Sequence, residues 1–82
     1  MRYVYLLQSE TSKRARYIGV TADLRQRLID HNSGKSPHTA KSVPWTLVAY
    51  LAFSDKQRAS EFERYLKSGS GHAFAIRHLW HR

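Results

Sequence analysis

The pattern of apolar and polar positions predicts six elements in the order strand, strand, helix, strand, helix, helix. Aromatic and branched residues fill Tyr3–Leu7, and the short run Arg16–Val20 follows after one polar segment, which predicts an antiparallel hairpin. Within the second run, Gly19 marks either a bulge or the close approach of another backbone or a ligand. The longest apolar stretch, Trp45–Phe53, predicts a third strand, which we expect at the centre of the sheet. The chain is therefore predicted to belong to the α+β class, with a small three-stranded antiparallel sheet flanked by helices in a single domain over residues 1–82.

Cap residues bound the predicted helices. Thr21 or Asp23 can cap the start of the first helix, and Gly34 can end it. Ser54 opens a capping-box pattern for the second helix, with Gly69 as its stop. A short third helix is expected within residues 70–82, anchored by apolar side chains and ending in basic ones. The anchors are Phe74, Ile76, Leu79 and Trp80, and the basic end comprises Arg77, His78, His81 and Arg82.

The first helix carries ionisable residues on its apolar side. At 100° per residue, Arg27 and His31 share one arc of about 100° with Leu24 and Leu28. Since the two leucines must face the core, both ionisable side chains are expected at the edge of the buried face. Burying an unpaired arginine is costly, so an anionic group is expected to meet Arg27.

The second helix also places a charge on its apolar arc, where Glu63 joins Ala59, Phe62 and Leu66. One interpretation is structural, because Arg27 and Glu63 can pair with each other across the two helices. The other is a phosphate site. Arginine binds phosphate oxygens bidentately, a carboxylate holds Mg²⁺, and strand tyrosines can direct a water at phosphorus. The spacing alone leaves both interpretations open.

Charge narrows the class of partner. Fourteen Lys and Arg residues against six Asp and Glu give a net charge of +8 and a pI of about 10.3. This balance favours nucleic acid first, an anionic membrane surface second and a basic protein without a polyanionic partner third. The linker Ser33–Pro44 contains Lys35, His38 and Lys41 and no acidic residue, so it either contacts phosphates or is a solvated connector. Arg25, outside the apolar arc, joins them as a candidate for binding nucleic acid.

Size and composition exclude other classes. The absence of cysteine rules out disulfides and thiolate metal sites. So small a domain leaves no room for a deep pocket, so chemistry is expected on an open surface without a small-molecule cofactor. The apolar run ending at Leu7 is too short for a signal peptide or a membrane span, so we expect a soluble cytoplasmic protein. The remaining aromatic residues are expected in the core and the remaining histidines on the surface. The first group is Trp45, Tyr50, Phe53, Phe62 and Tyr65, and the second is His72, His78 and His81.

Two tyrosine motifs connect these observations to a known family. Tyr3-Val4-Tyr5 and Tyr17-Ile18-Gly19 resemble the paired GIY and YIG elements of the GIY-YIG nuclease superfamily. The chain is similar to its small stand-alone members of the UPF0213 type over nearly its whole length. In the family's pattern an arginine lies ten residues after the YIG tyrosine and a histidine or tyrosine four residues later, which are Arg27 and His31 here. The family's metal-binding glutamate matches Glu63.

The resemblance implies hydrolysis of DNA phosphodiester bonds with Mg²⁺ or Mn²⁺. It implies that Tyr5, or as second choice Tyr17, positions and deprotonates the attacking water. Arg27 would neutralise the pentacovalent phosphate, and Glu63 would hold the metal. His31 would hydrogen-bond the tyrosine or relay its proton, and its alternative role is to cap carbonyls at the end of the helix.

The chain departs from the family's pattern at two places. Many larger members carry a lysine three residues after the YIG tyrosine, where this chain has Val20. Many also carry an asparagine beyond the metal-binding glutamate, whereas no asparagine follows Asn32 here. Both differences bear on the rate more than on the reaction.

Three functions compete at this point. The first is a metal-dependent endonuclease in DNA repair, recombination or uptake, acting on single-stranded or structured DNA because so small a domain has few ways to bend a duplex. The second is a nucleic-acid-binding module without catalysis, and the third is an interaction domain whose basic surface meets an acidic protein. The first requires five side chains to converge on one side of the sheet: Tyr5, Tyr17, Arg27, His31 and Glu63.

Overall fold

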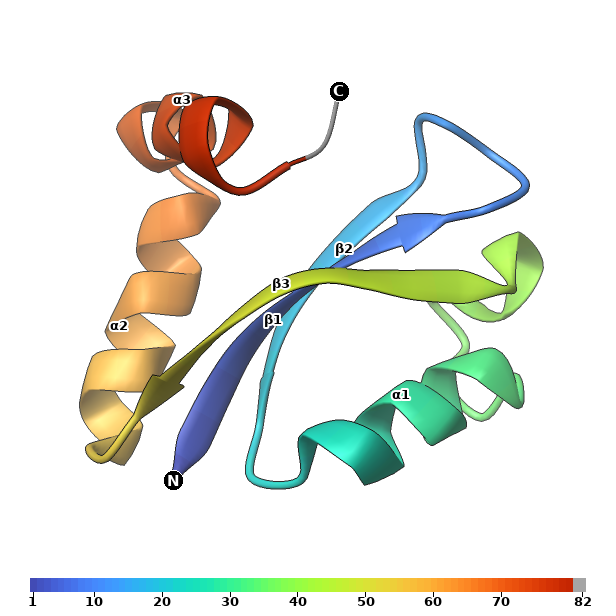
Figure 1. Cartoon of the computed structure of the whole chain (residues 1–82), viewed down its shortest axis with the longest axis horizontal. Helices are drawn as coiled ribbons and strands as arrows, with labels where there is room; N and C mark the ends of the chain where they lie inside the picture. Colours follow the sequence, from blue (N-terminus) through green and yellow to red (C-terminus); the bar gives the residue numbers. More distant parts are fainter. Residues whose placement is uncertain (81–82) are drawn as a thin grey trace.

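The computed structural model describes residues 1–80 and confirms the α+β class with the expected order of elements. Figure 1 shows α1 on one side of the strands and the α2–α3 pair on the other. None of the described helices is both long enough and apolar enough to cross a membrane. His81 and Arg82, expected at a basic end, lie outside the described residues. The elements are β1 (Arg2–Ser9), β2 (Arg16–Thr21), α1 (Leu24–Asn32), a short 3₁₀ helix (Ala40–Ser42), β3 (Trp45–Phe53), α2 (Lys56–Leu66) and α3 (Gly69–His78).

The sheet has the order β2-β1-β3, and both pairings are antiparallel. The expectation that the third strand would be central is therefore wrong. The first strand is central because its run Val4–Leu7 is buried at four consecutive positions, as a strand covered on both faces requires. In β3 only Trp45 is buried, which suits an edge position.

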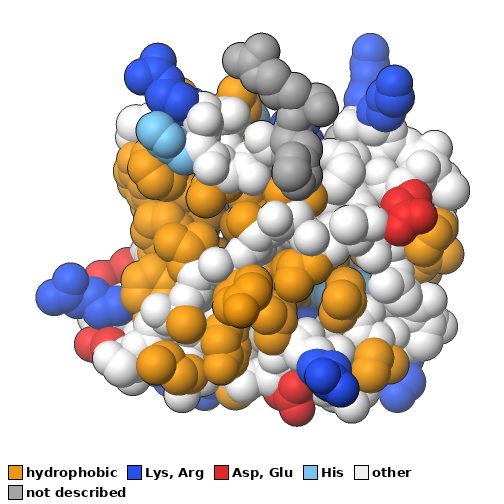
Figure 2. Space-filling model, in the orientation of Figure 1, with side chains coloured by type: hydrophobic (Ala, Val, Ile, Leu, Met, Phe, Trp, Pro, Cys, Tyr) orange, Lys and Arg blue, Asp and Glu red, His pale blue; other side chains and the backbone are white. Residues whose placement is uncertain are grey.

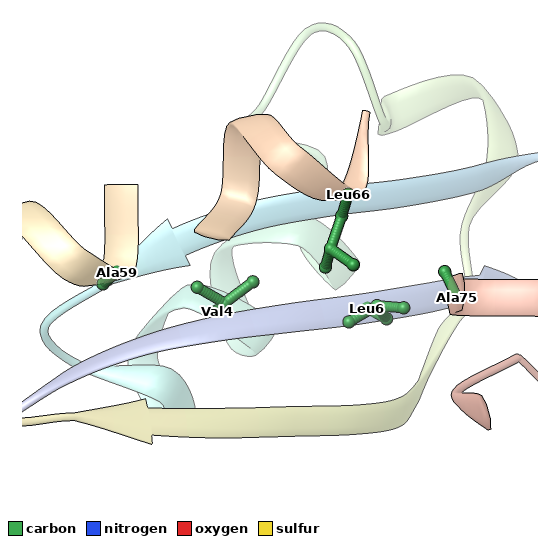
Figure 3. Close-up of a cluster of buried hydrophobic side chains, with 5 residues drawn as sticks. All are labelled: Val4, Leu6, Ala59, Leu66 and Ala75. Atoms are coloured by element: carbon green, nitrogen blue, oxygen red, sulfur yellow. The ribbon is translucent and has the colours of Figure 1, made fainter. Parts of the chain in front are cut away.

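Side chains of β1 alternate between two separate cores. Val4 and Leu6 point to the face covered by α2 and α3, where they pack with Ala59, Leu66 and Ala75 (Figure 3). On the other face, Tyr5 and Leu7 pack with Trp45 and with partly buried side chains of α1. The central strand therefore separates a purely apolar core from a core that contains tyrosine hydroxyls. The partly buried side chains around the second core include Tyr17, Leu24, Leu28 and Leu47.

The corner between α2 and α3 differs from the sequence prediction. Asp55, not Ser54, caps α2, and its carboxylate accepts the Gln57 N–H at 2.9 Å. Ser68 caps α3 by accepting the Gly71 N–H, so Gly69 begins α3 instead of terminating α2. A serine cap can start a new helix when only two residues, Lys67 and Ser68, separate it from the previous one, and a lone glycine in the sequence does not reveal this.

Three apolar side chains expected in the interior are exposed. Ile76 is 46% exposed, and Ala75 occupies the buried position of α3 instead, because the cap at Ser68 sets the phase of the helix. Tyr50 and Tyr65 are 54% and 40% exposed. Tyr50 lies on the edge strand β3, where the sheet is only partly covered. Trp45, Phe53 and Phe62 pack into the cores as expected.

We predict that Gly71→Ala destabilises the fold and that Gly69→Ala does not. A Cβ at Gly71 would overlap the backbone of Tyr65 and Leu66, whereas a Cβ at Gly69 would meet nothing within 4 Å. The free energy of unfolding, measured in urea, should fall by about 1–3 kcal/mol for Gly71→Ala. Gly69→Ala is the matched control in the same helical turn, and it should leave stability unchanged or raise it by up to about 1 kcal/mol. Equal values for the two variants would contradict this account of the corner.

Candidate active site

Three rings from three elements meet on the α1 side of the sheet. Tyr5 lies opposite Gly19, and Leu7 lies opposite Tyr17, so the two tyrosines occupy the same face of neighbouring strands. Ring centroids are 6.1 Å apart for Tyr5 and Tyr17, 5.7 Å for Tyr5 and His31, and 4.8 Å for Tyr17 and His31. The Tyr5 hydroxyl is 2.8 Å from Nε2 of His31, within hydrogen-bond distance. The fold thus brings together residues from distant parts of the chain.

The caps of α1 set the phase that aims its side chains at these rings. Asp23 accepts the Gln26 N–H at 3.0 Å and begins the helix, as one of the two expected caps. Gly34 follows the helix end with a positive φ of 82°, the left-handed conformation that glycine adopts without strain. With these bounds, Arg27 is partly buried and His31 is fully buried. The expected arc of the helical wheel is confirmed.

Gly19 makes room for the tyrosine pair. A Cβ at this position would lie 2.5 Å from the Tyr5 hydroxyl oxygen and 2.9 Å from the Tyr17 ring. The gap is filled by the Tyr5 side chain, and the sheet's irregularity lies elsewhere, between Leu6 and Leu7 in the pairing with β3. The expectation of a bulge at Gly19, or of another backbone or a ligand beside it, is therefore corrected.

Thr39, a residue that the sequence analysis did not single out, completes the hydrogen-bonded chain behind His31. Its Oγ1 lies 2.8 Å from Nδ1 of His31 and donates to the carbonyl of Ser36 at 3.4 Å. Because the Thr39 hydroxyl has one proton, it accepts from the Nδ1–H of His31. Nε2 then carries the lone pair and accepts the Tyr5 O–H. This tautomer is assigned from the hydrogen-bond network.

His31 does not cap the end of α1, because both of its ring nitrogens are engaged, one by Tyr5 and one by Thr39. Thr39 is itself held by the indole of Trp45, whose Nε1–H donates to the Thr39 carbonyl at 2.9 Å. No periodic pattern distinguishes Thr39 from its polar neighbours in the loop, so only the folded structure could identify it.

Burial and the guanidinium of Arg27 control the protonation of the cluster. Desolvation raises the pKa of Tyr5 to about 12, and the opposing effect of Arg27 is smaller. Desolvation also lowers the pKa of His31, with the positive charge of Arg27 acting in the same direction. The pKa of Arg27 is raised, because Tyr5 and Tyr17 together outweigh the effect of its desolvation. Near neutral pH the cluster therefore holds a neutral tyrosine, a neutral histidine and a charged arginine.

Glu63 comes from a helix on the other face of the sheet. Its helix, α2, packs on the opposite face of the sheet, so the expectation that all five side chains share one side is wrong for Glu63. The reason is that α2 buries its apolar arc against Val4 and Leu6. Within residues 1–80 the salt bridges are Asp30–Lys35 and Glu63–Lys67, so Arg27 and Glu63 are not paired.

The Glu63 side of α2 nevertheless faces the strand that carries Tyr17. Lys67, one turn along from Glu63, lines a hollow together with Tyr17. In the described part of the chain no three metal-ligating side chains come together. A single partly buried carboxylate is still a suitable donor for Mg²⁺, which keeps several waters and takes further ligands from substrate phosphates.

The four residues expected to bind nucleic acid do not form one patch. Arg25 is exposed in the first turn of α1, whereas the other three follow the far end of that helix. Lys35 pairs with Asp30 at 3.8 Å, and His38 and Lys41 are exposed on the loop that also contains Thr39. Figure 2 shows apolar side chains across the centre of one face and Lys and Arg side chains standing separately around its rim.

Comparison with known proteins assigns the family. Residues 1–74 match the GIY-YIG catalytic domain. The chain belongs to the GIY-YIG family. It is 38% identical over 66 residues to a UPF0213 protein of Streptococcus pneumoniae, a match that covers 79% of this chain and 65% of that protein.

Two further similarities agree with this assignment. The structure resembles the solution structure of a UPF0213 protein from Bacillus halodurans, with a TM-score of 0.55 and 32% identity over 94% of this chain and 84% of the other. The chain is also 37% identical to the structure-specific endonuclease subunit SLX1 of Candida dubliniensis, over 93% of its own length but only 28% of that subunit. Val20, one of the two positions at which the sequence departs from the pattern of the larger members, packs against the apolar core under α2.

We predict that the protein loses stability as the pH falls below about 6.5, the ordinary pKa of histidine. The folded pKa of His31 is lowered, so the unfolded chain takes up a proton at this ring at a higher pH than the folded chain. The unfolded state then binds more protons, and the free energy of unfolding decreases with decreasing pH. Urea unfolding between about pH 7.5 and pH 5 should show this decrease in the wild type, and His31→Gln should reduce it. An NMR titration of the His31 ring checks the pKa directly, and a midpoint at or above the ordinary value would contradict the prediction.

Proposed function

We propose that this chain is a metal-dependent endonuclease that hydrolyses phosphodiester bonds of DNA, with single-stranded or structured DNA as its substrate. The observation that carries the proposal is the buried hydrogen bond from Tyr5 to His31 beside Arg27. A hydroxyl with a base behind it and a cation beside it can activate a water next to a phosphate. Membership of the GIY-YIG family supports the reaction, and so does the similarity to a relative named as a structure-specific endonuclease.

In this proposal Tyr5 is the general base and His31 is the final proton acceptor. A pKa of about 12 means that free tyrosinate is scarce at neutral pH, so the proton of Tyr5 must leave as the water attacks. The water proton passes to the Tyr5 oxygen while the Tyr5 proton passes to Nε2 of His31. The water oxygen bonds to phosphorus, the bond to the leaving oxygen breaks, and that oxygen takes a proton from solvent. Thr39 keeps the acceptor nitrogen of His31 directed at Tyr5.

Arg27 stabilises the negative charge that grows on the phosphate. Because its pKa is raised, Arg27 stays positively charged at neutral pH and well above it. It interacts with both tyrosine hydroxyls, so a phosphate that approaches them also approaches the guanidinium. Tyr17 is only partly buried, so it is more exposed than Tyr5, and it is the second choice as base.

Glu63 is proposed to hold Mg²⁺ or Mn²⁺. Either ion, when bound, would neutralise charge on a non-bridging oxygen and on the leaving oxygen. Lys67 is paired with Oε2 of this carboxylate, so the ion competes with Lys67 for that oxygen, whereas Oε1 is not part of the ion pair. Arg25, Lys35, His38 and Lys41 are proposed to contact phosphates along the strand, which their exposure permits.

The second candidate is a nucleic-acid-binding module without catalysis. Two observations favour it: the Glu63 carboxylate is already paired with Lys67, and Val20 packs against the core at the position where the pattern of the larger members has a lysine. The two functions differ in whether DNA is cut, so one assay separates them.

We predict that Glu63→Ala abolishes cleavage that the wild type performs. Labelled single-stranded and duplex DNA would be incubated with each protein in Mg²⁺ or in EDTA and resolved on a denaturing gel. Cleavage by the wild type should require Mg²⁺ and fall by at least about 100-fold in Glu63→Ala, because the only proposed metal ligand is lost. Glu61→Ala is the matched control, since Glu61 is exposed two residues away on the same helix.

The control variant should cut DNA at the wild-type rate. Intact DNA with the wild type in Mg²⁺, together with salt-sensitive binding, would establish the module without catalysis. Equal cutting of single-stranded and duplex DNA would remove the proposed substrate preference but leave the nuclease.

We also predict that Tyr5→Phe lowers the cleavage rate more than Tyr17→Phe. Removing the Tyr5 hydroxyl removes the proposed base, which is worth about 10²- to 10⁴-fold in rate. Tyr50→Phe is the control, because that exposed hydroxyl lies outside the cluster. Single-turnover rates measure the chemical step in all three. A larger loss in Tyr17→Phe would transfer the role of base to Tyr17.

A further inference from the structure

A hollow of about 290 Å³ lies beside Tyr17 along the edge strand β2. Residues of β2, of the α2–α3 corner and of the segment after α3 surround it. Among the lining residues within the described range 1–80, three have basic side chains and none has an acidic one, so the hollow is suited to an anion. The lining residues are Arg16, Tyr17, Ile18, Lys67, His72 and Trp80.

Arg16 is held in a fixed orientation over this hollow. Its Nε–H donates to the side-chain oxygen of Gln8 at 3.1 Å, and its guanidinium carbon lies 4.7 Å from the centre of the Trp80 ring. These contacts use one of the five N–H donors of the guanidinium and support its plane by a cation–π interaction. The remaining donors suit the oxygens of a phosphate group, which arginine binds bidentately.

The other basic residues play different parts. Lys67 is paired with Glu63, so in this structure Arg16 contributes the principal unpaired positive charge of the described lining. His72 is exposed on α3 and brings further N–H donors or acceptors to the rim. His72 is exposed, as expected, whereas Arg16 was not among the expected site residues, because its neighbours Lys67 and Trp80 are far away in the chain.

The position of the hollow beside the proposed active site indicates which phosphate group of a DNA strand would bind in it. Tyr17 lines the hollow and its ring also lies 4.8 Å from the ring of His31, so this side chain belongs both to the hollow and to the proposed active site. The volume lies at the lower end of ligand pockets, which run from about 300 to 1,000 Å³. A hollow of this size can hold one phosphate group with its sugar, whereas the surface of another protein or of a bilayer is too large to enter it.

We infer that the hollow binds the phosphodiester group next to the one that is cleaved, on the same DNA strand. The inference rests on the proposed nuclease function. Arg16 binds the phosphate, Trp80 and Gln8 orient Arg16, and Tyr17 separates this phosphate from the one that reacts. The strand is thereby held along the open edge of the sheet, where a polymer can enter without being enclosed.

The test measures binding separately from cleavage. Fluorescence anisotropy with a labelled single-stranded DNA oligonucleotide in EDTA gives the Kd of each variant at several salt concentrations. Arg16→Gln should weaken binding several-fold and reduce the slope of log Kd against log salt by about 0.7, the value for one lost phosphate contact on a single strand. Arg58→Gln is the control, because it removes the same charge from an exposed residue of α2, and it should leave the slope unchanged.

A double-mutant cycle tests the role of Trp80. Trp80→Leu should weaken binding in the wild-type background and have little further effect in the Arg16→Gln background, because Trp80 acts through Arg16. In the wild type, the NMR signal of the Trp80 indole N–H should shift on adding the oligonucleotide, while that of buried Trp45 should not.

The outcomes separate this inference from the proposed function. A wild type that cuts DNA in Mg²⁺, with Arg16→Gln and Arg58→Gln binding alike, would overturn the subsite and leave the nuclease. A wild type that binds through Arg16 without cutting would retain a phosphate site and overturn the nuclease. An oligoglutamate of matched charge that binds with the same dependence on Arg16 would overturn the assignment to a nucleic acid strand.

Discussion

The buried hydroxyl of Tyr5 is the constraint on which the site depends. A polar group removed from water needs a hydrogen-bond partner. The backbone of β1 offers none, because β1 is the central strand and its N–H and C=O groups pair with the neighbouring strands. His31 provides that partner at 2.8 Å, and Thr39 fixes the proton on the far nitrogen of the ring. Gly19 leaves the space in which the hydroxyl sits. Four elements of local structure thus serve one hydrogen bond.

The alternation of side chains along β1 places the apolar core on one face of the sheet and the polar cluster on the other. Val4 and Leu6 hold α2 and α3, whereas Tyr5, between them in sequence, faces α1 and the polar cluster. One strand therefore supports an apolar core on one side and a hydrogen-bonded tyrosine–histidine pair on the other. The same alternation explains why Glu63 lies on the far side of the sheet and why any site that includes it must extend around the edge strand β2.

The positions of individual positive charges matter in this protein as well as the net charge. The net charge of +8 favours a polyanion, but it does not say where the polyanion lies. Arg27 beside the tyrosines and Arg16 beside Trp80 are cations oriented by their neighbours, whereas Lys35, His38 and Lys41 stand on an exposed loop. Oriented arginines suit the recognition of individual phosphates, and loop cations suit general attraction to a strand.

The class of fold, the order of elements and the buried arcs of α1 and α2 are predictable from the amino-acid sequence, because they follow from the periods of strands and helices. The sequence also indicated Tyr5, Tyr17, Arg27 and His31 through their spacing in two motifs and a helix. Three features follow from packing between elements: β1 is central, Asp55 and Ser68 cap the starts of α2 and α3, and the helix that carries Glu63 packs on the face opposite the tyrosines. The same holds for Thr39 and Arg16, whose partners His31 and Trp80 are eight or more residues away in the chain. The repeat of apolar positions along a strand or helix shows which face of that element a residue occupies. It does not show which side chains of another element pack against that face.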